Sequence, residues 1–254
     1  MTVAGHLGEL RRRIFWCVLV FVVLSVVCFV FIQRFVDAAL ALSTGFSFVY
    51  LSPSELLTSY MKLALVLGLV LASPFILWQI WAFVQPGLTE REASSARRAV
   101  ISGFVFFLLG AAFCYFLILP LTLQFLYSFN GSKDIAANIS FNSYMSFILG
   151  MLLAFGVVFE MPVLSYLLSR LGLLKPQTLV KARKYAVLAV FLVAAIITPP
   201  DVLSQIMTAL PMLALYELSI LVSRAAARRR EGEDDDEDEE DEEDEEDEDG
   251  EEEE

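Results

Sequence analysis

The chain has 254 residues, 57% of them hydrophobic, and a mean hydropathy of +0.65. This composition excludes an ordinary soluble domain and indicates membrane spans. The net charge of −13 combines two different segments, because 22 of the 31 acidic residues lie between Glu231 and Glu254, whereas the first 230 residues carry nine excess positive charges. We therefore predict a basic membrane domain at 1–230 and an acidic cytoplasmic tail at 231–254. Repulsion between its like charges predicts that the tail is disordered.

The first apolar segment, Ile14–Ile32, directly follows Arg11, Arg12 and Arg13. It is longer than the apolar region of a signal peptide, and no A-x-A cleavage site follows it. We therefore interpret it as a retained first membrane span.

Five further apolar segments follow the first. They are expected near 61–84 (on a helix that begins near Pro53), 99–127, 144–168, 185–198 and 202–222. Pro74, Pro120, Pro162 and Pro211 lie inside these runs, and each favours a kink because it removes a backbone hydrogen bond. The sequence thus predicts an all-α polytopic membrane protein, with six transmembrane helices in a kinked, concave bundle.

The distribution of positive charge predicts the orientation of these spans. With the N-terminus inside, 15 of the 18 basic residues fall in cytoplasmic segments, and only Arg34, Lys62 and Lys133 fall outside them. Cytoplasmic loops of membrane proteins carry such an excess of Lys and Arg. We therefore expect a multi-pass protein of the inner (cytoplasmic) membrane with both termini in the cytoplasm.

The fifth span is short. Sixteen residues separate Lys184 from Asp201, which is about 24 Å of helix, whereas a hydrocarbon core is about 30 Å thick. Two explanations remain open. Either the bilayer thins around the last two helices, or Arg183 and Lys184 extend their charged ends to the interface and nothing thins.

Glu160 is the most informative single residue. It precedes Arg170, at the cytoplasmic end of the fourth span, by ten residues, which places it near the middle of the bilayer. A carboxylate there is costly and suggests a functional role. The alternative is a structural hydrogen bond to another helix, for which Gln205 in the sixth span is the candidate partner.

Three other sites have simple structural explanations. Thr89 and Glu92 have the spacing of a capping box that opens the third span. Asp201 precedes the sixth span and is expected to cap it, and Pro53 has the favoured first position of an extracytoplasmic helix. At the N-terminus, binding of lipid headgroups explains the arginines but not Glu9.

Catalytic and metal-binding patterns are not evident. His6 is the single histidine, and the three cysteines lie in apolar runs without a CxxC spacing. We therefore expect no enzymatic activity, no metal and no cofactor. An alternative function is a proton-coupled small-molecule transporter that uses Glu160 as its proton carrier.

Six motifs occur in order along the chain: HLGELRRR, SPSE, WAFVQPGLTERE, YFLILP, FGVVFEMPV, and TPPDVLSQIMTALP followed by LYE. Together they resemble the TatC family of twin-arginine protein translocases along nearly the whole chain up to about Arg224. The acidic tail is not part of this resemblance.

The resemblance implies that the protein binds the twin-arginine signal peptides of folded precursors and recruits single-span TatA-type and TatB-type membrane proteins for export driven by the proton gradient. It also implies contact with membrane lipid and a homo-oligomer within the complex, but no nucleic acid. The residues that match positions expected to bind the signal peptide are Glu9, Arg11, Phe83, Pro86, Leu88 and Glu92. Glu160 and Gln205 match the intramembrane polar positions, and Pro53 and Asp201 belong to the extracytoplasmic loops.

Overall fold

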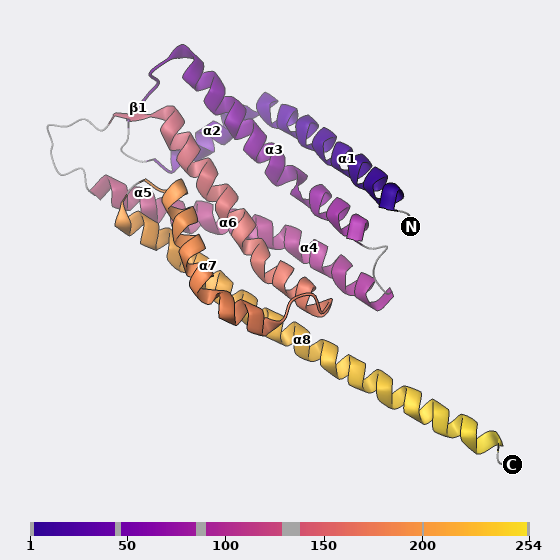
Figure 1. Ribbon diagram of the computed structural model, residues 1–254. Helices are drawn as coiled ribbons and strands as arrows, with labels where there is room; N and C mark the ends of the chain where they lie inside the picture. Colours follow the sequence, from indigo (N-terminus) through magenta and orange to yellow (C-terminus); the bar gives the residue numbers. More distant parts are fainter. Residues whose placement is uncertain (1–2, 44–46, 85–89, 129–137, 200, 253–254) are drawn as a thin grey trace.

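The computed structural model describes residues 3–43, 47–84, 90–128, 138–199 and 201–252 (Figure 1). Within these ranges, the side chains at 3–7, 84, 90–99, 231 and 233–252 lie outside the description. The elements in chain order are α1 (Val3–Val30), α2 (Ile32–Ala41), β1 (Ser47–Val49), α3 (Pro53–Val84), α4 (Glu90–Phe113), the π-helical turn η2 (Cys114–Ile118), α5 (Leu119–Ser128), β2 (Asn138–Ser140), α6 (Phe141–Arg170), α7 (Pro176–Ile197) and α8 (Val202–Glu252).

The predicted all-α, six-span membrane fold is confirmed. Five helical segments in the described residues are long and apolar enough to cross a bilayer; they are Gly8–Val30, Pro53–Phe83, Val100–Ser128, Phe141–Arg170 and Val202–Arg230. The remaining crossing is α7. Its first half contains Lys181, Arg183 and Lys184, so its apolar part is shorter than that of the other five. α7 begins nine residues before the fifth span predicted at 185–198, because hydropathy marks the part of a helix that is in lipid and not where the helix starts.

The third span contains a π-helical turn immediately before Pro120. Leu119 donates its backbone N–H to the carbonyl of Cys114, five residues earlier. Pro120 has no N–H to donate, and its ring would collide with the carbonyl four residues earlier in a regular helix. The wider turn accommodates both effects, so α4, η2 and α5 continue as one helical span from Glu90 to Ser128.

Helix α6 ends in a Schellman motif at Gly172. The N–H of Leu173 bonds to the carbonyl of Leu168 at 2.9 Å, and the N–H of Gly172 bonds to that of Ser169 at 3.1 Å. Gly172 has a φ of 70°, a left-handed conformation that glycine adopts without steric cost. This turn reverses the chain within a few residues and allows α7 to start at Pro176.

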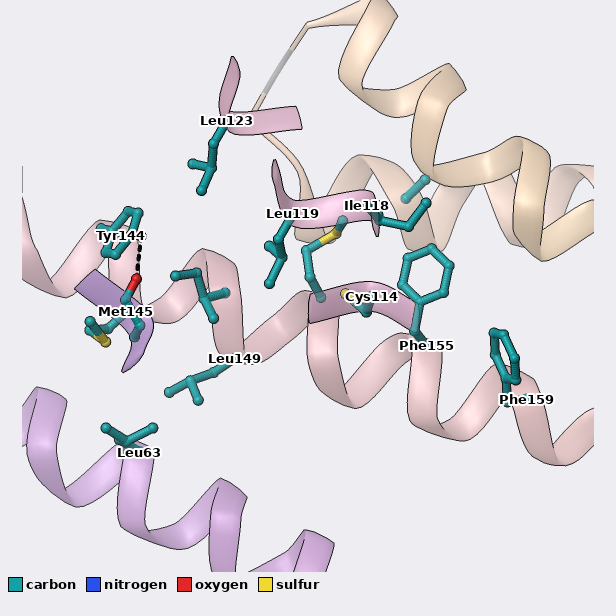
Figure 2. Packing of buried hydrophobic residues seen from close by; sticks show 14 of the residues in the cluster. Leu63, Cys114, Ile118, Leu119, Leu123, Tyr144, Met145, Leu149, Phe155 and Phe159 are labelled. Atoms are coloured by element: carbon teal, nitrogen blue, oxygen red, sulfur yellow. Dashed lines mark hydrogen bonds between the residues drawn. The ribbon is translucent and has the colours of Figure 1, made fainter. Parts of the chain in front are cut away.

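The core is built around α6, which packs against α3, α4 and α8 (Figure 1). Figure 2 shows the buried side chains at its centre, among them Cys114, Leu119 and Phe155. Glycines allow α4 to approach α6 closely. A Cβ atom at Gly110 would lie 2.7 Å from the carbonyl oxygen of Phe155, and one at Gly156 would lie 2.9 Å from the ring of Phe107.

Short elements tie the helices together at the end opposite the N-terminus. β1 and β2 pair in parallel, with Phe48 opposite Ile139. α2 lies beside them and buries one face, and its last-turn carbonyls accept hydrogen bonds from two tyrosines. Tyr115 donates to Ala38 at 2.9 Å. Tyr144 donates to Ala39 at 2.7 Å, which Figure 2 shows as a dashed line. Because the last carbonyls of a helix lack partners within it, these tyrosines stabilise the end of α2.

The structure differs from expectation at the C-terminus. α8 continues as a helix through the acidic residues to Glu252, where the sequence predicts disorder. Glutamate is a good helix former, and elongation of an existing helix avoids the cost of nucleation. The division into a membrane domain at 1–230 and a separate tail at 231–254 remains a prediction.

Candidate functional site

The residues predicted to bind a signal peptide map to one end of the bundle. The start of α1, the end of α3, the start of α4 and the end of α6 all lie there (Figure 1). Glu9 and Arg11 are on α1, and Phe83 is in the last turn of α3. Pro86 and Leu88 lie outside the described residues. Glu92 is the third residue of α4, and its side chain also lies outside the description.

Glu9 is held in an ion pair with Arg13, one helical turn along α1. The Nε and Nη2 atoms of Arg13 both donate to the same oxygen, Oε1 of Glu9, at 3.0 and 2.5 Å. The remaining nitrogen, Nη1, donates to Oε1 of Gln79 on α3 at 3.1 Å. Both charged side chains are largely covered, with exposed fractions of 22% for Arg13 and 28% for Glu9. The guanidinium thus joins α1 to α3 at this end.

Arg13 and Gln79 are parts of this site that the sequence predictions missed. The spacing of Glu9 and Arg13 is that of a stabilising helical ion pair and could have indicated their contact. Nothing in the sequence pairs α1 with Gln79. Phe83 lies one turn beyond Gln79 on α3 and is half-buried, whereas Arg11 is exposed. The structure therefore combines a carboxylate, a guanidinium and an amide at the same end as an aromatic ring.

Close packing of small residues sets the distance between α1 and α3. A Cβ atom added at Gly68 would lie 2.1 Å from Oγ and 2.7 Å from Cα of Ser25. The hydroxyl of Ser25 is turned back onto its own helix and donates to the carbonyl of Phe21 at 2.8 Å. The two backbones can therefore approach each other here, and this approach aligns Glu9 and Arg13 with the end of α3.

Glu160 occupies a different position, inside the bundle. Its side chain is buried between α6 and α4, and a Cβ atom at Gly103 would lie 2.8 Å from its Oε2 atom. Within the part of the chain that the structure describes, its Oε1 atom is buried and makes no hydrogen bond. A buried carboxyl group with an unsatisfied oxygen is costly to retain, which makes a functional role for Glu160 a reasonable hypothesis.

The predicted pairing of Glu160 with Gln205 is wrong. Gln205 donates its side-chain amide to the carbonyl of Phe191 on α7 at 2.9 Å. Contact between Thr208 and Met151 sets the register of α8 against α6. Met151 precedes Glu160 by nine residues, or about 13 Å of helix, so Gln205 lies well outside the reach of the carboxylate. The number of residues between a side chain and the end of its helix indicates its depth in the membrane only coarsely. Gln205 lies near the start of α8, which begins at Val202, whereas Glu160 lies deep within α6.

Two predicted features at the opposite end are confirmed as helix starts. Pro53 is the first residue of α3, and Asp201 caps α8 by accepting the N–H of Ser204 on Oδ1 at 2.7 Å. The neighbouring Glu55 joins two helices. Its carboxylate accepts the N–H of Leu51 at 2.6 Å, and Oε1 accepts the hydroxyl of Ser140 at 2.5 Å and the N–H of Asn142 at 3.3 Å. A negative charge is favourable there because it lies at the N-terminus of α6.

The described residues contain no group of three or more His, Cys, Asp or Glu side chains arranged to hold a metal ion. Where side chains are described, charged and polar groups lie at one end of the bundle, and the carboxyl group of Glu160 is buried within it.

Residues 5–211 match the family model described as Sec-independent protein translocase protein (TatC). The chain is 42% identical over 219 residues to the Sec-independent protein translocase protein TatC of Helicobacter pylori (strain J99), covering 86% of this chain and 87% of the relative. It is 36% identical over 238 residues to the Sec-independent protein translocase protein TatCy of Bacillus subtilis (strain 168), covering 91% of this chain and 92% of the relative. A solved structure described as the twin arginine translocase receptor TatC superposes with a TM-score of 0.79 at 36% identity, covering 87% of this chain and 99% of that one.

Proposed function

The chain belongs to the TatC family of Sec-independent protein translocase proteins, and from this premise we propose that it is the receptor subunit of a twin-arginine translocase. It binds the twin-arginine signal peptides of folded precursors on the cytoplasmic side of the inner membrane. TatA-type and TatB-type single-span proteins then assemble with it, and the proton gradient drives export.

The observation that carries this proposal is the largely covered carboxylate of Glu9 at the same end of the bundle as Phe83 and the start of α4. A carboxylate accepts the two parallel N–H groups of a guanidinium, which distinguishes arginine from lysine. The arginine-binding residues that we propose are Glu9 and Glu92, with Arg11, Phe83, Pro86 and Leu88 around them. The first 230 residues carry a net positive charge that repels a cationic peptide, so local carboxylates are required.

Charge also supports the orientation that this function needs. Both ends of the six-span domain lie at the same end of the bundle (Figure 1). Lys181, Lys184 and Arg228 are exposed at this end, which is therefore proposed to face the cytoplasm. In that orientation Pro53, Glu55 and Asp201 belong to the extracytoplasmic side.

A proton-coupled small-molecule transporter that uses Glu160 is not favoured. It would leave Glu9 and Glu92 without a role, whereas the receptor function accounts for both. Glu160 and Gln205 are proposed to serve within the membrane part of the translocase, at separate positions along the bundle.

The proposal is tested by photo-crosslinking a twin-arginine signal peptide to the purified full-length protein, with a twin-lysine peptide as the control. We expect a crosslink near Glu92 that the twin-lysine peptide forms only weakly, and we expect Glu92→Arg to abolish it while the protein still inserts. Crosslinks of equal strength for both peptides would contradict the receptor function.

A further inference from the structure

Arg13 lies where a signal-peptide arginine is expected to bind. Its Nε and Nη2 atoms both contact Oε1 of Glu9, the carboxylate that we assign to arginine recognition. The contact has the same chemistry as the proposed substrate contact, a guanidinium on a carboxylate. Neither Arg11 nor Arg12 does this, since both are exposed and extend from other faces of α1.

We infer that Arg13 is an internal competitor of the signal peptide, occupying Glu9 in the unliganded receptor and leaving it when a substrate arginine binds. This inference rests on the proposed function and concerns the same site. It assigns to Arg13 a role in setting the affinity of the receptor, a role distinct from direct contact with the signal peptide.

Gln79 provides the position to which Arg13 can withdraw. Nη1 of Arg13 already donates to Oε1 of Gln79 at 3.1 Å, so this bond can persist when Nε and Nη2 leave Glu9. The guanidinium then keeps a partner on α3 and is not left unpaired in a largely covered site. Because this bond is retained, Arg13 can leave Glu9 and return to it at a small cost in free energy.

The strength of the pair suits an exchangeable contact. Helical ion pairs of this spacing are weak at exposed sites, and double-mutant measurements of such pairs correspond to about a 1.5- to 5-fold change in an equilibrium. The partial burial of Glu9 and Arg13 places this pair toward the upper end of that range. A substrate arginine supplied together with the apolar part of its signal peptide can therefore displace it.

Competition has a specific signature. A competitor that must leave before any cation binds lowers the affinity for every cationic peptide by the same factor, so it changes the dissociation constant without changing the preference for arginine over lysine. If Arg13 served instead to hold Glu9 in position for the substrate, its removal would weaken binding and reduce that preference.

The test measures dissociation constants of fluorescent twin-arginine and twin-lysine signal peptides for the full-length protein in lipid nanodiscs. Arg13→Met removes the guanidinium, and Arg12→Met is the matched control because it removes one positive charge from an exposed neighbouring residue. Arg13→Lys retains the charge without the planar fork and is the second variant if Arg13→Met does not fold.

We expect Arg13→Met to tighten binding of both peptides by the same factor, about two- to five-fold relative to Arg12→Met, with Arg13→Lys in between. In a Glu9→Gln background, Arg13→Met should behave like Arg12→Met, since no carboxylate remains to compete for. Equal effects of Arg13→Met and Arg12→Met in the parent protein, or weaker binding by Arg13→Met, would overturn the competition while leaving the receptor function intact. Failure of the parent protein and of every variant to bind either peptide would overturn both.

Discussion

Gly103 on α4 faces the carboxyl group of Glu160 on α6, so that a Cβ atom at this glycine would lie only 2.8 Å from Oε2. The absence of a side chain on one helix thus creates the space for an acidic side chain on the other. The neighbouring atoms belong to the end of the Glu160 side chain, which can rotate, and not to the backbone of α6.

Gly103→Ala is therefore expected to force the carboxyl group of Glu160 out of its present position. The cost in the free energy of unfolding should be about 1 kcal/mol, since only a side-chain end must move. Unfolding in mixed detergent micelles would measure it. In a Glu160→Ala background the same substitution should cost less, and an equal cost in both backgrounds would show that the collision is not with Glu160.

Gly110→Ala should be more disruptive, because its collision is with groups that cannot rotate away. The added Cβ atom would lie 2.7 Å from the carbonyl oxygen of Phe155 and from Cβ of Phe159, so α4 and α6 must separate. We expect a loss of about 1–3 kcal/mol in the free energy of unfolding. Gly150→Ala is the matched control on α6, where the new atom would meet only Cγ2 of Ile197 at 3.3 Å. Similar losses for the two variants would contradict this account of the α4–α6 contact.

Gly68→Ala should disturb the proposed receptor site from a distance. The added atom would collide with Oγ, Cα and N of Ser25, so α1 must move away from α3 and carry Arg13 away from Gln79. We expect weaker binding of the twin-arginine peptide, measured by fluorescence titration, whereas Gly150→Ala leaves it unchanged. Ser25→Ala should not restore binding, because Cα and N would still lie within 2.8 Å of the new atom. Restoration by Ser25→Ala would mean that only the hydroxyl is in the way.

Glu55→Ala should loosen the outer end of the bundle. It removes the acceptor for the N–H of Leu51, the hydroxyl of Ser140 and the N–H of Asn142, and with it the contact that joins the start of α3 to the start of α6. Thermal unfolding and faster hydrogen exchange at the amides of Leu51 and Asn142 would report the loss. Glu217→Ala is the control, because its ion pair with Arg183 is about half exposed and such pairs contribute about 0–1 kcal/mol. Unchanged exchange at both amides in Glu55→Ala would contradict the bridging role.

Several features of the fold were predictable because they depend on local sequence. The start of α3 at Pro53 and the cap that Asp201 forms on α8 follow from short-range signals. The first residue of α7, Pro176, was not predictable from hydropathy, since helix outside the lipid has no hydropathic signature. Charge repulsion predicts disorder for the acidic residues, whereas α8 continues through them as a helix that extends from an existing one.

The amino-acid sequence by itself determined that the chain crosses a membrane six times and which acidic residues stand out, because the requirement for apolar residues in lipid acts on each segment separately. Only the tertiary structure decided which of those residues meet. Glu9 contacts Arg13, and the guanidinium of Arg13 donates to Gln79. Gln205 donates to the carbonyl of Phe191 and not to Glu160. Such pairings depend on the register between helices, which is set by close contacts of small residues such as Gly68 with Ser25. A shift of one turn moves every partner by about 5 Å without changing the hydropathy of either helix.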